Sequence, residues 1–436
     1  MRKIALHNLG CKVNSCEADE MARRFLAAGY QIVDFGEAAD ICIVNTCTVT
    51  NTADKKSRQM LHRARSKNPD AIIVAAGCYA DVSAEEILRD GTADLIVTNK
   101  DKPRILELVR EAEAKKWPES PGRSAVRTDM EKNGAGEGLL RTRAILKIED
   151  GCDMFCSYCI IPHARGRVRS EPLSKIKENA GKIAAAGRRE AVITGINISA
   201  YGRDLRDGTT LLDVIRAVAD TDGIERIRFG SIDPAMVTKE LVRQLSQLGK
   251  VCPHFHLSLQ SGCDETLKRM NRHYTTGEFE EKCDMLREHF DDPALTADII
   301  TGFPGETDDE FKMTESFIRR IGFADLHVFK YSVRKGTKAA SMPGQVSPSV
   351  KACRSERLID AGREMSLDFK RRRLSGTGEV LFEEKIRIGD DEYFIGYSGE
   401  YIKTAVKAEG AGELKNTIRQ VRFCGMSDDQ MMLAIL

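Results

Sequence analysis

Strand-like and helix-like segments alternate along this chain from its first residues to about residue 330. In the first hundred residues the apolar runs "KIALHNLG", "ADICIVNTC", "AIIVAAGC" and "ADLIVTN" each precede a segment with helical periodicity. Strands that are joined through helices pair in parallel and carry helices on the faces of the sheet. We therefore expect a doubly wound parallel α/β domain over residues 1–118.

The alternation stops and starts again further along the chain. Residues 114–140 are rich in Pro, Gly, Ser and charge, as in a linker. After them, six strand-like runs alternate with helices: "AILKIE", "AVITGI", "IRFGSI", "HFHLSL", "LTADIITGF" and "DLHVFKYS". Six βα units are fewer than the eight of a closed barrel, so we expect a partial (β/α)6 barrel over residues 138–367, with its working face at the carboxyl ends of the strands.

The C-terminal part has a different period. From about residue 368, short alternating strands such as "GEVLFEE", "EYFIGYS" and "TIRQVRF" are separated by Gly, Asp and Glu turns. This predicts a small all-β, OB-like barrel over residues 368–436, a shape that often binds nucleic acid. The expected whole is a multidomain α/β protein.

Composition limits the class of protein. No apolar run approaches the roughly 20 residues of a membrane span, and the N-terminus lacks the pattern of a secretory signal. We therefore expect a cytoplasmic protein without a membrane partner. The 13 cysteines are then expected to be metal ligands, nucleophiles or buried side chains rather than disulfides. A net charge of +1 means that a nucleic acid would have to meet a local basic patch.

Three cysteines stand close together in "EDGCDMFCSYCIIPHARGR": Cys152, Cys156 and Cys159. With His163 they could bind a structural zinc, although such sites more often use paired Cys-x2-4-Cys clips. A four-iron cluster explains the spacing better, because three thiolates hold three irons and leave the fourth open for a reacting ligand.

A second cysteine trio is spread over the N-terminal domain. Cys11, Cys47 and Cys78 each follow a different predicted strand. Loops after parallel strands share one edge of the sheet, where ligands bind, so these residues can converge there. We interpret the other cysteines as structural, and His7, His254 and His256 as strand or core histidines.

The spacing Cys-x3-Cys-x2-Cys resembles that of the radical S-adenosylmethionine (SAM) enzymes. Together with "NLGCKVNS", "VNTCTVTNTADKKSRQ", "AAGCYA", "LQSGCDETLKRMNR" and "DIITGFPGET", the chain resembles the methylthiotransferases over essentially its whole length. The resemblance implies two [4Fe-4S] clusters: a catalytic one on Cys152, Cys156 and Cys159 that binds SAM, and a second on Cys11, Cys47 and Cys78. It also implies a radical SAM barrel and a C-terminal barrel of the TRAM type.

The resemblance is strongest to the branch that modifies N6-threonylcarbamoyladenosine beside the tRNA anticodon. The isopentenyladenosine branch and the ribosomal-protein branch remain alternatives. The implied partners are a tRNA substrate and a reductant such as flavodoxin or ferredoxin, and the sequence is compatible with a monomer. Two hypotheses from other classes remain. One is a two-cluster electron carrier, although such proteins usually bind each cluster through four cysteines; the other is an RNA-binding protein with structural zinc.

Further site residues are expected around the clusters. SAM contacts are expected from "TGIN", which departs from the common Gly-Gly-Glu form, and from polar groups at later strand ends, although turn formation or capping would also explain these residue types. Phosphate contacts are expected from arginines, with surface solvation as the alternative. The SAM set is Thr194, Gly195, Asn197, Ser231, Gln260, Ser261 and Asp298; the tRNA set is Arg165, Arg167, Arg169, Arg371 and Arg372.

Overall fold

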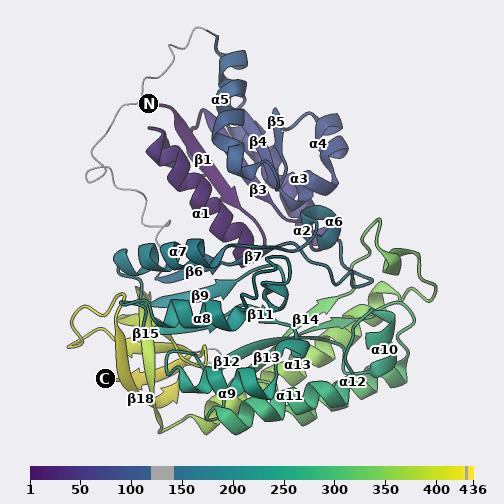
Figure 1. Cartoon of the computed structure of the whole chain (residues 1–436), viewed down its shortest axis with the longest axis vertical. Coiled ribbons are helices and arrows are strands. Elements are labelled where there is room, and N and C mark those ends of the chain that lie inside the picture. The colour runs from purple at the N-terminus through teal and green to yellow at the C-terminus, as the bar shows by residue number, and fades with distance from the viewer. Residues whose placement is uncertain (119–141, 428–430) are drawn as a thin grey trace. The chain divides into compact units, whose positions relative to one another are not determined.

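The computed structural model describes residues 1–118, 142–427 and 431–436, so most of the predicted linker lies outside the described residues. The chain divides into two compact units (Figure 1). One takes the described residues up to 118 together with 150–167 and 332–337, and the other takes the remaining described residues. Two segments from inside the second predicted domain, 150–167 and 332–337, thus belong to the N-terminal unit.

The N-terminal unit is built on a parallel five-stranded sheet, as predicted, in the order β2-β1-β3-β4-β5. Alternate residues of a strand pack in two different hydrophobic cores. On β3, Ile41 and Ile43 belong to one core, and Cys42 and Val44 belong to the other. The elements are β1 (Lys3–Asn8), α1 (Lys12–Ala27), β2 (Gln31–Val33), β3 (Ile41–Thr46), α2 (Asn51–Lys67), β4 (Ile72–Gly77), α3 (Cys78–Val82), α4 (Ala84–Asp90), β5 (Leu95–Val97), η1 (Lys102–Arg104) and α5 (Ile105–Lys116).

The second unit carries the six predicted strands, parallel and in chain order, in two hydrogen-bonded sheets. The third strand is divided at Gly230, where the chain passes from the sheet of β6, β9 and β10 to that of β11, β12, β13 and β14. These strands are β6 (Arg143–Lys147), β9 (Glu190–Thr194), β10 (Arg226–Phe229), β11 (Ser231–Ile232), β12 (His254–Gln260), β13 (Ala294–Thr301) and β14 (Asp325–Lys330).

Helices cover one face of these strands. Capping boxes start three of them, with Thr210 on Asp213, Thr275 on Glu278 and Thr307 on Glu310, which fixes where each helix begins. The helices are α7 (Leu173–Ala185), α8 (Leu211–Ala219), α9 (Lys239–Gln247), α10 (Asp264–Arg269), α11 (Thr276–His289), α12 (Asp308–Ile321) and α13 (Pro348–Arg372). The predicted boundary at residue 367 therefore falls inside a helix, α13. Within the described residues, no helix is both long and apolar enough to span a membrane.

The C-terminal strands close into a barrel in the order β15-β16-β17-β19-β18. They are β15 (Thr377–Ile388), β16 (Asp391–Ser398), β17 (Lys403–Lys407), β18 (Ile418–Met426) and β19 (Met432–Ile435). The β16–β17 turn is held by arginines of the parallel strands, since Arg226 donates to the Ser398 carbonyl at 2.7 Å and Arg228 donates to the Gly399 carbonyl at 2.8 Å. Arg143 stacks on Tyr397 and Tyr401, at 4.5 and 4.8 Å from the ring centres.

Candidate functional site

The second cysteine trio lies at the carboxyl edge of the N-terminal sheet. Cys11 precedes α1, Cys47 directly follows β3, and Cys78 begins α3 directly after β4. The strand order 2-1-3-4-5 reverses direction between β1 and β3, and the crevice at such a switch point is where open α/β sheets bind ligands. The structure therefore brings the three predicted thiols to the ends of three adjacent strands.

Two glycines allow the loops that carry these cysteines to approach one another. Gly10 has φ +100°, and a Cβ added to it would lie 2.9 Å from the Cys47 sulfur. Gly77 has φ +92°, and an added Cβ would lie 2.6 Å from the Thr46 carbonyl oxygen. Both positions exclude larger residues on conformational and steric grounds. The close approach of the loops thus depends on the glycines that directly precede Cys11 and Cys78.

Burial opposes ionisation of these thiols. Cys47 and Cys78 are 7% and 4% exposed, while Cys11 is exposed. Burial raises the pKa of the Cys47 thiol to about 11 and also raises the pKa of the Cys78 thiol, although Arg165 and Lys102 act in the opposite direction on Cys78. Because metal ligands must be thiolates, a bound metal and nearby cations have to provide the compensating positive charge.

The positive charge beside Cys78 comes from Arg165, in the short helix α6 (Ile161–Arg165). Its Nε donates to the Cys78 sulfur at 3.2 Å, and its other nitrogens contact Glu17 at 2.8 Å, Asp150 at 3.0 Å and Asn14 at 2.5 Å. The Arg165 side chain is 0% exposed. The prediction that Arg165 reaches tRNA phosphates is therefore wrong, because the guanidinium is used inside the protein.

A second buried arginine reaches the loop after Cys47. Arg334 lies in the 332–337 segment and donates to the side chains of Thr48 and Asn51, both at 2.6 Å, and it pairs with Asp54 at 2.7 Å. Sequence reasoning missed both arginine contacts. The partners are hundreds of residues apart in one case, and an isolated Arg in sequence looks like a surface residue.

The first cysteine trio occupies an open loop before α6. The Cys152 amide donates to the Gly166 carbonyl at 3.0 Å, and the Cys159 amide donates to the Cys156 carbonyl at 3.0 Å. All three cysteines are partly exposed. Phe155, within the loop, has φ +46° and is 43% exposed. The loop thus presents its thiols from a tight, locally bonded turn that is accessible to ligands.

The number of thiols in each trio favours a cluster over a single ion. A structural zinc site is closed by four protein ligands, whereas a four-iron cluster binds each thiolate to a different iron, so three thiolates leave one iron open. Three cysteine donors in each trio fit such a cluster. Over the part of the chain that the structure describes, one other set of three ligand atoms lies mutually within 4.8 Å, and it contains no cysteine.

The set within 4.8 Å joins the predicted Asp298 to His256 and His327, on β13, β12 and β14. One Asp298 oxygen lies 3.2 Å from His256 Nε2, and the other lies 3.2 Å from His327 Nδ1. Burial opposes ionisation of Asp298, but these hydrogen bonds outweigh it and hold the pKa of the carboxyl well below its usual range. Hydrogen bonds with Asp298 and Asp325 raise the pKa of His327 to about 10.

This cluster faces away from the helix-covered core. On β13, Leu295, Ala297 and Ile299 pack in that core, so Asp298 lies on the opposite face of the sheet. His256 was expected to be a strand or core histidine. Its strand position is confirmed, but its Nε2 lies 3.2 Å from the Asp298 carboxylate and the side chain is not part of the apolar core.

The "TGIN" residues lie around a buried glutamate that sequence reasoning missed. Thr194 is buried at the end of β9, and the Asn197 amide donates to Glu149 Oε2 at 2.7 Å. Gly195 packs closely enough that an added Cβ would lie 2.6 Å from the same oxygen. Glu149 is 0% exposed and stands three residues before Cys152. The available signal was a carboxylate at the end of the run "AILKIE", just before the first cysteine of the trio.

The remaining predicted SAM residues lie on or after β11 and β12. Ser231 is exposed and lies 2.8 Å from the Ser258 hydroxyl, and Gln260 ends β12 with φ +70°. Ser261 is buried, and its hydroxyl accepts from the Cys263 amide at 3.3 Å. This contact spans two residues, as in a turn, so it agrees with the alternative of turn formation for Ser261. The ligand contact of Ser261 stays a prediction.

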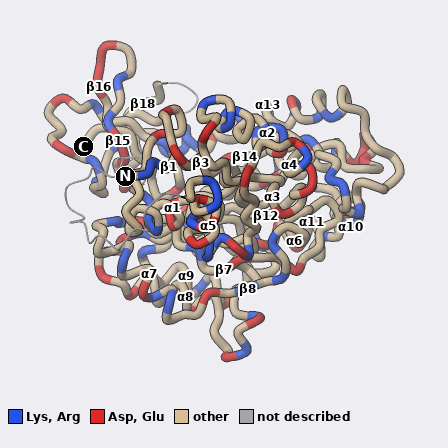
Figure 2. The backbone as a smooth tube through the Cα atoms, turned by 90° about the horizontal axis from the view of Figure 1, so that it is seen from above, with Lys and Arg blue, Asp and Glu red and all other residues tan. Residues whose placement is uncertain are grey.

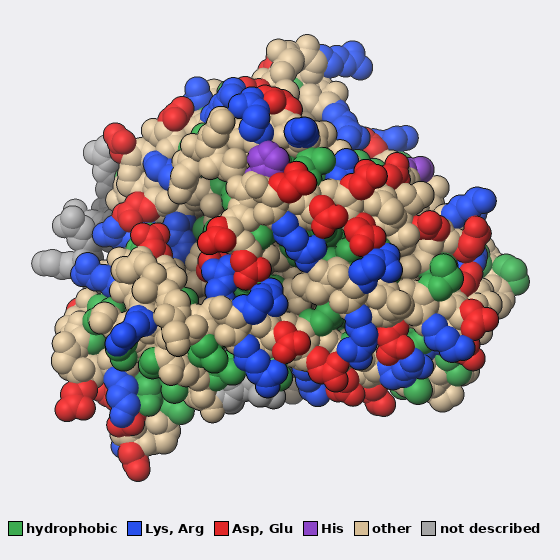
Figure 3. Space-filling model, turned by 90° about the horizontal axis from the view of Figure 1, so that it is seen from below, with side chains coloured by type: hydrophobic (Ala, Val, Ile, Leu, Met, Phe, Trp, Pro, Cys, Tyr) green, Lys and Arg blue, Asp and Glu red, His purple; other side chains and the backbone are tan. Residues whose placement is uncertain are grey.

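The other predicted tRNA-binding arginines are exposed. Arg167 contacts Asp153 at 3.2 Å, and Arg169 lies in β8 (Arg169–Ser170). Arg371 and Arg372 end α13, and their side chains are 61% and 54% exposed. Basic and acidic residues are interspersed along the chain (Figure 2) and on the face shown in Figure 3. These arginines therefore offer local contacts rather than a broad basic surface.

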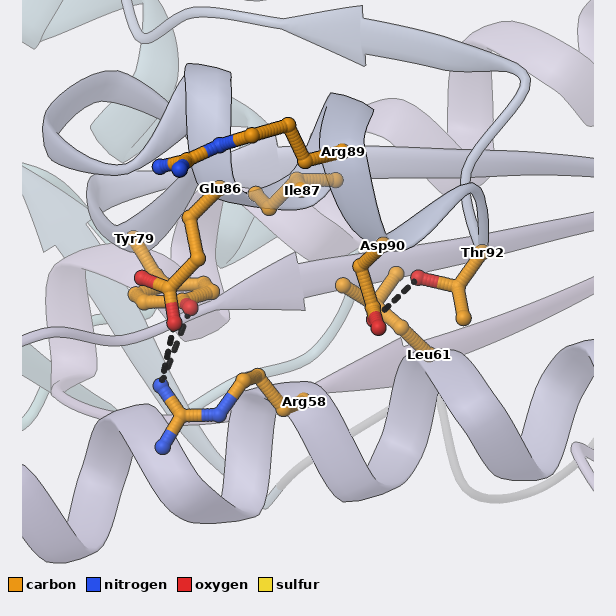
Figure 4. A pocket seen from close by; sticks show the side chains of 8 residues that line it. All are labelled: Arg58, Leu61, Tyr79, Glu86, Ile87, Arg89, Asp90 and Thr92. Carbon is orange, nitrogen blue, oxygen red and sulfur yellow. Dashed lines mark hydrogen bonds and ion pairs between the residues drawn. The ribbon is translucent and has the colours of Figure 1, made fainter.

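An open pocket of about 510 Å³ lies in the N-terminal unit (Figure 4). It is lined by residues of α2, α3 and α4 and by Thr92. Arg58 contacts the Tyr79 hydroxyl at 3.0 Å and Glu86 at 3.4 Å, and Thr92 donates to Asp90 at 3.1 Å. Arg58 and Glu86 pair with each other, and Arg89 donates to the Glu85 carbonyl at 3.3 Å. The cysteine trios remain the stronger candidate site.

Comparison with known proteins agrees with this geometry. A family model described as "Radical SAM superfamily" matches residues 146–318, and one described as "Uncharacterized protein family UPF0004" matches residues 3–98. A cobalamin-binding radical S-adenosylmethionine methyltransferase from Kitasatospora setae, TsrM, shares the fold with a TM-score of 0.57 at 15% identity, over 78% of this chain and 77% of that one.

Relatives with higher identity align over most of the chain. The threonylcarbamoyladenosine tRNA methylthiotransferase MtaB of Bacillus subtilis is 37% identical over 93% of this chain and 91% of its own length, and that of Thermotoga maritima is 35% identical over 94% and 95%. A tRNA-2-methylthio-N(6)-dimethylallyladenosine synthase of Caldicellulosiruptor saccharolyticus is 34% identical over 86% and 80%. This chain belongs to the radical SAM methylthiotransferase family of enzymes.

Proposed function

We propose that this enzyme adds a methylthio group to C2 of N6-threonylcarbamoyladenosine, the tRNA nucleotide 3′ of the anticodon. Four relatives that carry the name threonylcarbamoyladenosine tRNA methylthiotransferase are 33–37% identical to this chain. Proteins named tRNA-2-methylthio-N(6)-dimethylallyladenosine synthase are 31–34% identical. The threonylcarbamoyl substrate is therefore the better supported of the two.

The observation that carries this proposal is the pair of cysteine trios, one on an open loop and one at a sheet switch point. Cys152, Cys156 and Cys159 would hold the SAM-binding cluster, and Cys11, Cys47 and Cys78 would hold the second cluster. When bound, the first cluster and SAM would supply a radical that attacks an aromatic C–H bond, and the second cluster would supply an open iron that carries sulfur. The protein's part is to provide three thiolates to each cluster and to leave one iron accessible.

The strand ends would form the SAM site. We assign Thr194, Gly195 and Asn197, beside Glu149, to backbone contacts with SAM, and Ser231, Gln260 and Asp298 to its polar groups. Six parallel strands in chain order support a partial (β/α)6 barrel, and the closed five-stranded C-terminal barrel supports a TRAM domain. The domains would be 1–118, 138–367 and 368–436.

Binding of tRNA would use the exposed arginines Arg167, Arg169, Arg371 and Arg372. Arginine suits this role because its planar group contacts phosphate oxygens in pairs. We place the enzyme in the cytoplasm, where its tRNA substrate lies, with electrons supplied by a small flavodoxin or ferredoxin. A monomer would suffice, because both trios belong to one chain.

Nucleoside analysis of tRNA from a strain that lacks the gene tests the substrate. We expect the methylthio form of threonylcarbamoyladenosine to disappear, and to return with the wild-type gene and with Cys353→Ala, an exposed cysteine outside the trios. Cys11→Ala and Cys152→Ala should not restore it. An unchanged profile would refute the proposal, and loss of the methylthio isopentenyladenosine instead would indicate the other tRNA branch.

A second measurement tests the class of protein. After anaerobic reconstitution and reduction, the enzyme should convert SAM to deoxyadenosine, whereas a two-cluster electron carrier should not. Metal analysis that finds zinc and no iron would instead favour an RNA-binding protein with structural zinc.

A further inference from the structure

One buried guanidinium contacts parts of the chain that carry both cysteine trios. Arg165 lies six residues after Cys159, and its Nε donates to the sulfur of Cys78 at 3.2 Å. Its Nη1 contacts both oxygens of Asp150, at 3.0 and 3.1 Å, two residues before Cys152. The same side chain therefore binds one end of the first trio's loop and one thiol of the second trio.

The residues around Arg165 stabilise its positive charge. Glu17 on α1 accepts from Nη1 at 2.8 Å and from Nη2 at 3.1 Å, and Asn14 accepts from Nη2 at 2.5 Å. Lys102 contacts Glu17 Oε2 at 2.5 Å, the oxygen that also accepts from Arg165 Nη2. Two cations thus face two carboxylates, and the cysteine sulfur is the remaining acceptor. A thiolate at Cys78 adds a negative charge that a guanidinium at 3.2 Å directly compensates.

Lysine could not make the same set of contacts. The guanidinium presents several N–H groups in a fixed plane, whereas an ammonium is a single point donor. Arg165 uses this plane to reach α1, the loop before Cys152 and the start of α3 together. A hydrogen bond to a cluster-bound sulfur, and positive charge near it, favour the reduced form of an iron–sulfur cluster.

We propose that Arg165 is a positioning residue that fastens the loop of Cys152, Cys156 and Cys159 to Cys78 and raises the reduction potential of the cluster on Cys11, Cys47 and Cys78. This inference rests on the proposed second cluster. It gives the two trios a physical connection that neither cysteine pattern supplies. It also predicts that the readiness of the second cluster to accept an electron depends on a residue of the first cluster's loop.

The test measures the second cluster alone in the full-length chain. In a background with Cys152, Cys156 and Cys159 replaced by alanine, Arg165→Met is reconstituted anaerobically beside the unchanged background, and its potential is followed by electron paramagnetic resonance. We expect the reduction equilibrium to shift at least tenfold toward the oxidised form, which is about 59 mV for a one-electron couple. Lys102→Met is the matched control, because it removes a cation of the same network that donates to Glu17. Its shift should be clearly smaller.

Three further outcomes decide the matter. Equal potentials for Arg165→Met and the unchanged background would overturn the proposal, as would a Lys102→Met shift as large as that of Arg165→Met. If Arg165→Met binds no iron, the double variant Arg165→Met/Glu17→Gln keeps the net charge of the network and should bind the cluster at the lowered potential. Loss of the cluster there too, with normal loading in Lys102→Met, would overturn the tuning role.

The conservative variant separates fastening from charge. Arg165→Lys keeps the cation but cannot reach all three segments, so hydrogen exchange in the 150–167 segment should rise while part of the potential is retained. Unchanged exchange would contradict the fastening role. These readouts do not depend on tRNA, so they distinguish failure of this inference from failure of the proposed substrate.

Discussion

Replacing Asp298 by asparagine is expected to lower the pKa of His327 from about 10 to a value between that and its ordinary 6.5. Asp298 Oδ1 lies 3.2 Å from His327 Nδ1 and contributes the largest part of the increase, while Asp325 lies 3.6 Å from the other ring nitrogen. The asparagine keeps the size of the side chain but removes the charge. Asp325→Asn is the matched control and should lower the pKa less.

The contribution of this pair to stability follows from its geometry. The difference between about 10 and 6.5, which Asp298 and Asp325 produce together, corresponds to about 5 kcal/mol for fully shielded groups at 1.36 kcal/mol for each pKa unit. The His327 side chain is 50% exposed, so solvent screens the interaction and we expect about 1 kcal/mol instead. Because the raised pKa favours the protonated folded form, this stabilisation is complete below pH 6.5 and is lost as the pH rises through about 10.

Nuclear magnetic resonance of labelled histidines, over a pH range that spans both values, measures the pKa of His327 directly. Chemical unfolding of wild type and Asp298→Asn, below pH 6.5 and above pH 10, measures the stability difference. The two proteins should differ by about 1 kcal/mol at the lower pH and converge at the higher. A wild-type His327 that titrates near 6.5, or a stability difference that grows with pH, would refute this reasoning.

Two further substitutions test other parts of the structure. Gly77→Ala places a Cβ 2.6 Å from the Thr46 carbonyl oxygen, in a backbone conformation that costs about 1–3 kcal/mol for other residues. We expect the iron content of this variant to fall from two clusters to one. The control is Gly29→Ala, which has φ +84° and no atom within 4 Å of the added Cβ, and it should keep both clusters. Full loading of Gly77→Ala would contradict this account. Glu190→Gln leaves the buried Arg228 without its carboxylate at 2.8 Å and should destabilise the second unit by about 3–5 kcal/mol in urea unfolding. Arg228 and Arg226 outweigh burial and lower the pKa of Glu190, so the loss should begin to shrink once the pH falls below about 4.3, the ordinary pKa of a glutamate. A variant as stable as wild type at neutral pH would contradict this expectation.

The strands that pack in a core were predictable, because their apolar runs are long enough to stand out from the helices. The short edge strand β2, with three residues, and the five-residue helix α3 carry too little pattern to be seen. The placement of Cys11, Cys47 and Cys78 at one sheet edge followed from strand order alone.

The chemistry between distant residues was not predictable. Arg165 reads as a surface arginine, because its partners Glu17 and Cys78 lie 148 and 87 residues away in the sequence. His256 was interpreted as a strand or core histidine, since its contact with Asp298 depends on how neighbouring strands are aligned. A sequence pattern predicts which face of a strand or helix a residue occupies. Which charged side chains contact one another depends on how the strands and helices pack in three dimensions.

The arginines that hold the β16–β17 turn connect the C-terminal barrel directly to the parallel strands. A flexible tether would let the distance between them vary with thermal motion, whereas the hydrogen bonds from Arg226 and Arg228 to that turn restrict it. For a tRNA that contacts both the barrel and the parallel strands, the distance between the two contact points would then be fixed by the protein. The spacing between the two contact points, rather than base identity alone, would select which nucleotide arrives at the strand ends.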